Sequence, residues 1–258
     1  MEPILRYVDL LYKTFGPGPE QKHGYPGHPE IELALLRLHA KTNDPRHYAF
    51  AAYFIEERGN PNGQYGNHYY DVESEARGDR VNERPVYLPA NQSYWYQQAH
   101  VPIVDQQTIE GHSVRAMYLL TAVADLVRMD GTDASNPKRD ALHRLWSNMV
   151  DKKMYLTGGI GAMKQWEGFG IDYFLPSGTD EGGCYAETCA AIGVMMLAER
   201  LLQVSPHHIN YWKLTLTRLD RLGREIRRYF GTVLLQCRYD GHVGSWNAIH
   251  IRQSVGVE

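Results

Sequence analysis

Two side chains able to bind a metal or act in catalysis, Glu187 and Cys189, stand two residues apart at the start of an apolar helical pattern. Positions i and i+2 point in nearly opposite directions on a helix but to the same side of an extended segment. Carboxylate oxygens and thiolate sulfurs both bind zinc, although a tetrahedral site needs about four donors. A purely structural pair is the alternative, with Cys189 a small buried apolar residue and Glu187 an acid favoured by the helix dipole.

A second carboxylate, Glu167, lies between Trp166 and Phe169 and follows a glycine-rich turn at residues 158–161. A carboxylic acid among aromatic residues and glycines is kept protonated more easily than one in water, which suits a general acid. Residues 155–189 therefore indicate an active-site loop.

Four segments resemble one known family. They are GYPGHPEIELALLRLHAKTNDPRHYAFAAYFIEERG (residues 24–59), AHVPIVDQQTIEGHSVRAMYLLTAVADL (99–126), MYLTGGIG (154–161) and, after the acid, YAETC (185–189). Their sequences and their order are similar to those of glycoside hydrolase family 127, which is typified by non-reducing-end β-L-arabinofuranosidases.

The resemblance implies a mechanism and a set of site residues. In that family a Glu and three cysteines hold zinc, one of these cysteines is the nucleophile, and a second Glu is the acid/base. Glu187 and Cys189 match the Glu and the first cysteine of the metal site, and Glu167 matches the acid/base. His28 and His112 match histidines that line the sugar pocket. The implied cofactor is zinc, and the implied substrate is a glycan that ends in L-arabinofuranose.

The sequence also departs from the family. The last two zinc cysteines of the family lie in a Cys-Cys-Pro motif that has no match here, since Cys184 and Cys237 fall in other contexts. The expectation is that residues 1–258 correspond to the central part of the catalytic domain, without its early helices and its C-terminal β-domains. The zinc site would then be incomplete, the nucleophile missing and the activity impaired.

Apolar periodicity predicts helices in pairs. Stripes at residues 31–38 and 48–55 flank Asp44-Pro45, a cap followed by a first-turn proline, and so predict a helical hairpin. Further helices are expected at about 106–129, 138–154, 185–203 and 209–229, and strand signals are nearly absent before Thr232. The predicted fold is all-α, an incomplete (α/α)6 toroid of helical hairpins with long loops on the active-site side.

Residues 60–91 lack helical periodicity, and a loop of this length is usually functional or mobile. His68 lies within it, where a solvated histidine is the favoured interpretation. His100 precedes a helix, so a capping or core role and a role in the site are equally compatible with the sequence.

The 258 residues carry a formal net charge of −3, which gives no reason to expect nucleic acid or an anionic membrane as a partner. No apolar run approaches the length of about 20 residues that spans a bilayer, and the N-terminus lacks the features of a signal peptide, which favours the cytoplasm. The oligomeric state is left open.

Three other functions are compatible with these features. The chain could bind sugar without catalysis, keeping His28, His112 and Glu167. It could be a helical-hairpin scaffold for protein contacts, although no repeat period recurs along it. It could also be a metal-free hydrolase or epimerase on another (α/α) barrel. Zinc content would separate that enzyme from the zinc-dependent hydrolase that the resemblance implies.

Overall fold

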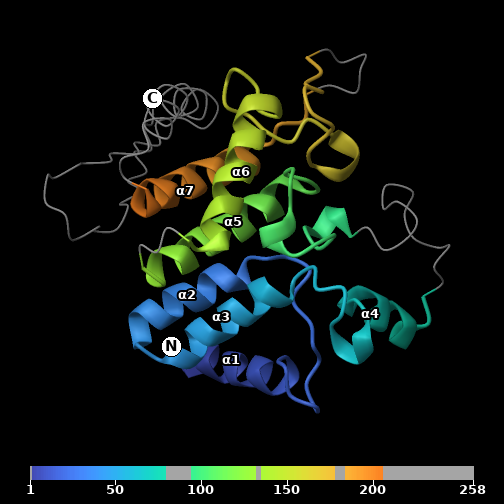
Figure 1. The fold of residues 1–258 in the computed structure, drawn as a ribbon, viewed down its shortest axis with the longest axis vertical. Helices are drawn as coiled ribbons and strands as arrows, with labels where there is room; N and C mark the ends of the chain where they lie inside the picture. Colours follow the sequence, from blue (N-terminus) through green and yellow to red (C-terminus); the bar gives the residue numbers. More distant parts are fainter. Residues whose placement is uncertain (1, 80–93, 132–134, 178–183, 206–258) are drawn as a thin grey trace, which may run out of the picture.

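The computed structural model describes residues 2–79, 94–131, 135–177 and 184–205 (Figure 1). Within these ranges the protein is all-helical, as predicted, and β-structure is limited to isolated bridges. The expected helix at 209–229 and Cys237 lie outside the described residues. The α-helices are α1 (Glu2–Thr14), α2 (Ile31–Thr42), α3 (Pro45–Glu57), α4 (Tyr69–Arg77), α5 (Ser113–Met129), α6 (Pro137–Lys152) and α7 (Thr188–Val204).

Helices α2 and α3 form the predicted hairpin. Asn43 ends α2 in the left-handed conformation with φ 55°. The carboxylate of Asp44 then accepts a hydrogen bond from the Arg46 N–H at 2.9 Å and caps α3, with Pro45 in its first turn. Local sequence alone therefore specifies this turn, and the two helices pack side by side (Figure 1).

Helix α5 is the centre of the described structure. Thirteen of its seventeen residues are buried, because α2, α3, α6 and α7 all pack against it. Its contact with α7 is close at Gly193, where an added Cβ would lie 2.6 Å from the Cβ of Met117. The first turns of α5 and α7 therefore lie next to each other, and these turns carry residues expected at the site.

The predicted starts of α5 and α7 were wrong. Helix α5 begins at Ser113 and not near 106. Gly111 has φ 76°, which is not helical. The backbone of Ile109 forms hydrogen bonds with the side chains of Asn148, on α6, and Lys153, directly after α6. Helix α7 begins at Thr188 and not at 185, because Ala186 has φ 33° and Glu187 is extended. Both helices thus start directly beside a candidate site residue.

The segment expected to be one long loop contains helix α4, which residues 69–77 form. His68 is not a solvated loop residue, since it is 8 % exposed. Its Nδ1 accepts the Tyr70 N–H and caps α4, and its Nε2 lies 2.9 Å from the Ala99 carbonyl oxygen. His68 is therefore a structural residue that fastens α4 to the segment before α5.

None of the helices in the described ranges combines the length and the apolar character needed to cross a membrane.

Candidate functional site

Glu167 lies at the tip of a short turn that several backbone contacts hold. Met163 and Gly168 exchange backbone hydrogen bonds of 2.9 and 3.1 Å, which places Glu167 in the left-handed conformation with φ 53°. Its carbonyl oxygen accepts hydrogen bonds from both the N–H and the hydroxyl of Ser113, at 3.0 and 2.8 Å. The turn is thereby attached to the first residue of α5.

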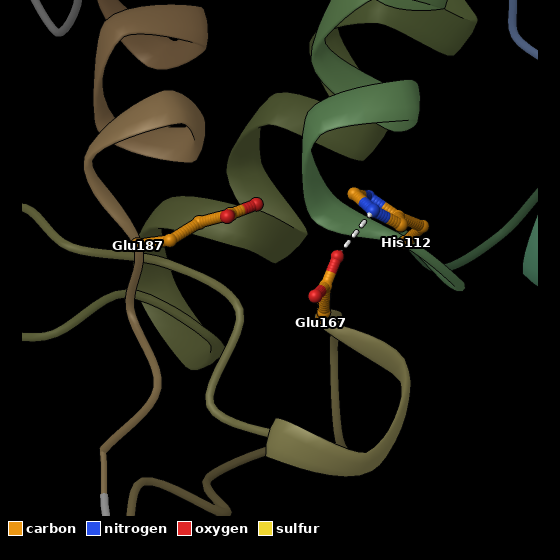
Figure 2. A group of neighbouring side chains, drawn as sticks. All are labelled: His112, Glu167 and Glu187. Atoms are coloured by element: carbon orange, nitrogen blue, oxygen red, sulfur yellow. Dashed lines mark hydrogen bonds and ion pairs between the residues drawn. The ribbon is translucent and has the colours of Figure 1, made fainter.

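Both carboxylate oxygens of Glu167 accept hydrogen bonds. Oε2 lies 3.1 Å from His112 Nε2, and Oε1 accepts the hydroxyl hydrogen of Tyr185 at 2.9 Å. The Glu167 side chain is nevertheless 47 % exposed, compared with 11 % for His112. Figure 2 shows the His112–Glu167 contact, with Glu187 extending toward it from the segment that leads into α7. The carboxylate is thus oriented by two donors and still reachable from solvent.

The hydrogen bonds of His112 determine its tautomer. His112 is the N-cap of α5, and its Nδ1 accepts the Val114 N–H at 3.2 Å. A nitrogen that accepts carries no proton, so in the neutral ring the proton is on Nε2, which donates to Glu167. Burial lowers the pKa of His112, and the charge of Arg115 lowers it further, against the opposing effect of Glu167. The neutral ring is therefore favoured.

Glu187 lies just before α7 in an extended conformation and makes no side-chain capping bond. Its carboxylate faces Glu167, and ligand atoms of His112, Glu167 and Glu187 all lie within 4.8 Å of one another. Burial raises the pKa of Glu187, and the nearby Glu167 charge raises it further. Two carboxyl groups with different environments at one site are typical of acid/base chemistry.

The described residues supply only part of a zinc site. Glu187 is extended, whereas Cys189 already lies in the first turn of α7, and Cys189 is an exposed free thiol, not a buried apolar residue. His112, Glu167 and Glu187 form the one described group of three close donors. His112 fits poorly there as a ligand, since Nε2 could bind a metal only with the proton moved to Nδ1, which faces the Val114 N–H.

His28 lies on the loop before α2 and is exposed at 45 % of its side chain. Its ring packs against Tyr118 of α5, with centroids 5.4 Å apart. Burial and then Arg115 lower the pKa of His28, and the charge of His28 in turn lowers the pKa of His112. The two histidines expected at the sugar pocket are therefore near enough to interact electrostatically.

Tyr118 of α5 interacts both with His28, on the loop before α2, and with Glu187 and Cys189, at the start of α7. Burial raises the pKa of its hydroxyl, and Glu30, Cys189 and Glu187 raise it further. Its ring contacts His28 at the same time. The structure thus brings all five predicted site residues, His28, His112, Glu167, Glu187 and Cys189, to one region around the first turns of α5 and α7.

Besides Tyr118, three aromatic or charged residues in this region were not predicted. The expected helix at 185–203 includes Tyr185, but Tyr185 lies before α7 and donates to Glu167. Tyr and Glu two apart in an extended segment face the same side, which is the signal that could have identified it. Arg115 stacks on the ring of Tyr96, 4.9 Å from its centroid, and that ring lies edge-on to His112, with centroids 5.8 Å apart.

Comparison with known proteins identifies the family. Residues 1–212 match the family described as beta-L-arabinofuranosidase, GH127 catalytic domain. The chain belongs to glycoside hydrolase family 127. Among curated members, the non-reducing end beta-L-arabinofuranosidase of Bifidobacterium longum subsp. longum is 37 % identical over 207 residues, which are 80 % of this chain and 29 % of that protein.

Solved structures of family 127 agree with this. A GH127 beta-L-arabinofuranosidase from Geobacillus stearothermophilus T6 is 35 % identical, with a TM-score of 0.73 over 86 % of this chain and 31 % of that one. A second GH127 beta-arabinofuranosidase is 31 % identical, with a TM-score of 0.66 over 86 % of this chain and 28 % of that one. The resemblance found in the sequence is confirmed, and the chain spans less than a third of the length of these relatives.

Proposed function

We propose that the chain contributes the acid/base and part of the sugar pocket of a hydrolase that cleaves terminal β-L-arabinofuranosides. The relatives named above carry this activity in their descriptions. Glu167 is the acid/base, and His28 and His112 bind the sugar. The carboxyl group of Glu167 donates its proton to the glycosidic oxygen as a thiolate nucleophile from outside the described residues bonds to the anomeric carbon and the bond from that carbon to the glycosidic oxygen breaks. The resulting Glu167 carboxylate then takes a proton from the water that attacks the anomeric carbon and releases the thiolate.

The observation that carries this proposal is the environment of the Glu167 carboxyl group. The carboxyl group is hydrogen-bonded to His112 and Tyr185. Ser113 holds the Glu167 backbone to α5, and about half of the Glu167 side chain is exposed to solvent. A group that is oriented by neutral donors and also accessible suits proton transfer to a bound substrate.

Glu187 and Cys189 are proposed as the two zinc ligands that the described residues provide, with the remaining ligands from outside them. Zinc, when bound, would lower the pKa of thiol ligands and turn a thiol into a usable nucleophile. Glu187 makes no capping bond to α7, and Cys189 is an exposed free thiol.

Hydrolysis of an aryl β-L-arabinofuranoside by the purified, zinc-supplemented chain tests the proposal. Glu167→Gln should lower the rate about 100- to 10,000-fold, the usual contribution of a general acid/base. Glu56→Gln is the matched control, because Glu56 is an exposed carboxylate of α3 that pairs with Lys138 away from the site. Equal, measurable rates of hydrolysis for Glu167→Gln and the unchanged protein would contradict the assignment.

Sugar binding without hydrolysis is the second candidate, and the partial zinc site favours it. The described residues offer Glu187 and Cys189 for a metal that takes about four donors. In that case the chain would bind methyl β-L-arabinofuranoside in an NMR titration and release no aryl alcohol in the assay. Zinc bound per chain, measured by mass spectrometry, should then be substoichiometric.

A further inference from the structure

The side chain of Arg58 is almost completely buried, at 1 % exposure, directly after α3. Its Nη2 donates to the Pro26 carbonyl oxygen at 2.7 Å and its Nη1 to the Gln97 carbonyl oxygen at 3.1 Å. The guanidinium also pairs with the fully buried Glu32 at 3.1 Å and lies over the ring of Tyr25, 4.7 Å from its centroid. One side chain therefore joins α2, α3 and two loops.

The two loops that Arg58 joins are those that carry or support the pocket histidines. Pro26 is two residues before His28. Gln97 follows Tyr96, whose carbonyl oxygen accepts the His112 N–H at 3.2 Å and whose ring packs edge-on against His112. The planar guanidinium fork has donors in fixed directions, so the two carbonyl bonds define a distance between the loops.

Arg58 itself has little freedom to move. The next residue, Gly59, has φ 81°, and a Cβ there would lie 2.4 Å from the carbonyl oxygen of Val101. The Gly59 N–H also donates to the hydroxyl of Tyr25 at 3.3 Å. The end of α3 therefore packs against both Val101 and Tyr25.

A buried ion pair such as Arg58–Glu32 is weak evidence for a role in stability, because desolvation of both charges offsets most of their attraction. We propose that Arg58 is a positioning residue for the sugar pocket, which sets the separation of His28 and His112 through the carbonyl groups of Pro26 and Gln97. The inference rests on the proposed function only for the identity of the ligand, since the positions of the two histidine rings can be measured in the unliganded protein.

The test replaces Arg58 with lysine. Arg58→Lys keeps the charge opposite Glu32, but a single ammonium group lacks the two-pronged geometry that reaches both carbonyl oxygens. The matched control is Arg200→Lys, because Arg200 of α7 pairs with the buried Asp125 at 2.8 Å, at the other end of α5 from His112. Urea denaturation measures the loss of stability in each variant.

Two readouts separate positioning from stability. NMR titration with methyl β-L-arabinofuranoside should show at least about tenfold weaker binding for Arg58→Lys and unchanged binding for Arg200→Lys. The ring signals of His28 and His112 in the unliganded protein should shift in Arg58→Lys and stay in place in Arg200→Lys. Unchanged affinity and unchanged ring signals in a folded Arg58→Lys protein would overturn the inference.

The remaining outcomes are also decisive. If Arg58→Lys does not fold, the double variant Glu32→Met/Arg58→Met removes both buried charges and is judged by the same two readouts. If the unchanged protein does not bind the arabinofuranoside, the proposed function fails for this chain, and the ring signals alone then support or overturn the role of Arg58.

Discussion

The imidazole of His112 holds the Glu167 carboxylate with one nitrogen and the first turn of α5 with the other. Nε2 lies 3.1 Å from Glu167 Oε2, and Nδ1 accepts the Val114 N–H at 3.2 Å. Because the helix cap occupies the lone pair of Nδ1, the neutral ring can only donate to Glu167. The start of α5 and the orientation of the proposed acid/base therefore depend on the same side chain.

Substitution of His112 separates these two tasks. Asparagine is among the best N-cap residues and can accept the Val114 N–H, but it is too short to reach Glu167. We expect His112→Asn to leave the free energy of unfolding nearly unchanged and His112→Ala to lower it by about 1 kcal/mol. Urea denaturation measures this difference, and both variants should bind methyl β-L-arabinofuranoside more weakly than the unchanged protein.

Two other results would contradict this account of His112. Equal destabilisation by both substitutions would mean that the ring does not stabilise α5 as a cap. Full affinity in His112→Asn would mean that neither the ring nor its bond to Glu167 contributes to sugar binding.

Helix boundaries that local sequence determines were predicted well. Helix boundaries that depend on contacts with residues far away in the sequence were not. The α2–α3 turn depends on Asp44 and Pro45, which act within a few residues. The start of α5 depends instead on Lys153 and Asn148, whose side chains bond the Ile109 backbone from more than 35 positions away. Residues 106–112 contain a single apolar residue, Ile109, and their sequence gives no sign of these contacts.

The site residues show the same division. Glu167, Glu187 and His112 could be proposed because each belongs to a motif that resembles family 127. Tyr185 also stands in such a motif, YAETC, but its hydrogen bond to Glu167 depends on the turn that brings Glu167 to within 2.9 Å of its hydroxyl. The role of Arg58 requires two carbonyl groups, which no residue type in the sequence reveals.

Gly161 should be sensitive to substitution because it supports the Glu167 turn. It has φ 78°, and a Cβ there would lie 2.6 Å from the Ser113 hydroxyl oxygen that bonds the Glu167 carbonyl. Gly78 at the end of α4 has a similar φ of 75° but no atom within 4 Å of an added Cβ. The left-handed conformation costs about 1–2 kcal/mol in both alanine variants, and overpacking adds about 1–3 kcal/mol in Gly161→Ala alone.

Urea denaturation of both glycine variants measures the difference. Gly161→Ala should in addition weaken arabinofuranoside binding, because Ser113 and with it Glu167 must shift, whereas Gly78→Ala should bind normally. Similar losses of stability in the two variants would show that the space around Gly161 accommodates a methyl group.

The dependence of stability on pH should reflect the buried histidines. Burial lowers the pKa of His47, His100 and His112 below the ordinary value. Below a pH of about 6.5 the unfolded chain therefore binds protons that the folded chain does not, and the free energy of unfolding falls as the pH falls. Burial raises the pKa of Glu57 and Glu187, which acts in the opposite direction.

A variant isolates the contribution of one histidine from these opposing effects. Burial is the main cause of the lowered pKa of His100, against an attraction from Glu110. His100→Gln removes the titrating ring and leaves the carboxyl groups in place, so its unfolding free energy should fall less than that of the unchanged protein between about pH 7.5 and about pH 5.5. Urea denaturation at the two pH values gives both differences. Equal differences would mean that His100 takes up its proton equally in the folded and unfolded chains, which is incompatible with a ring held neutral by burial.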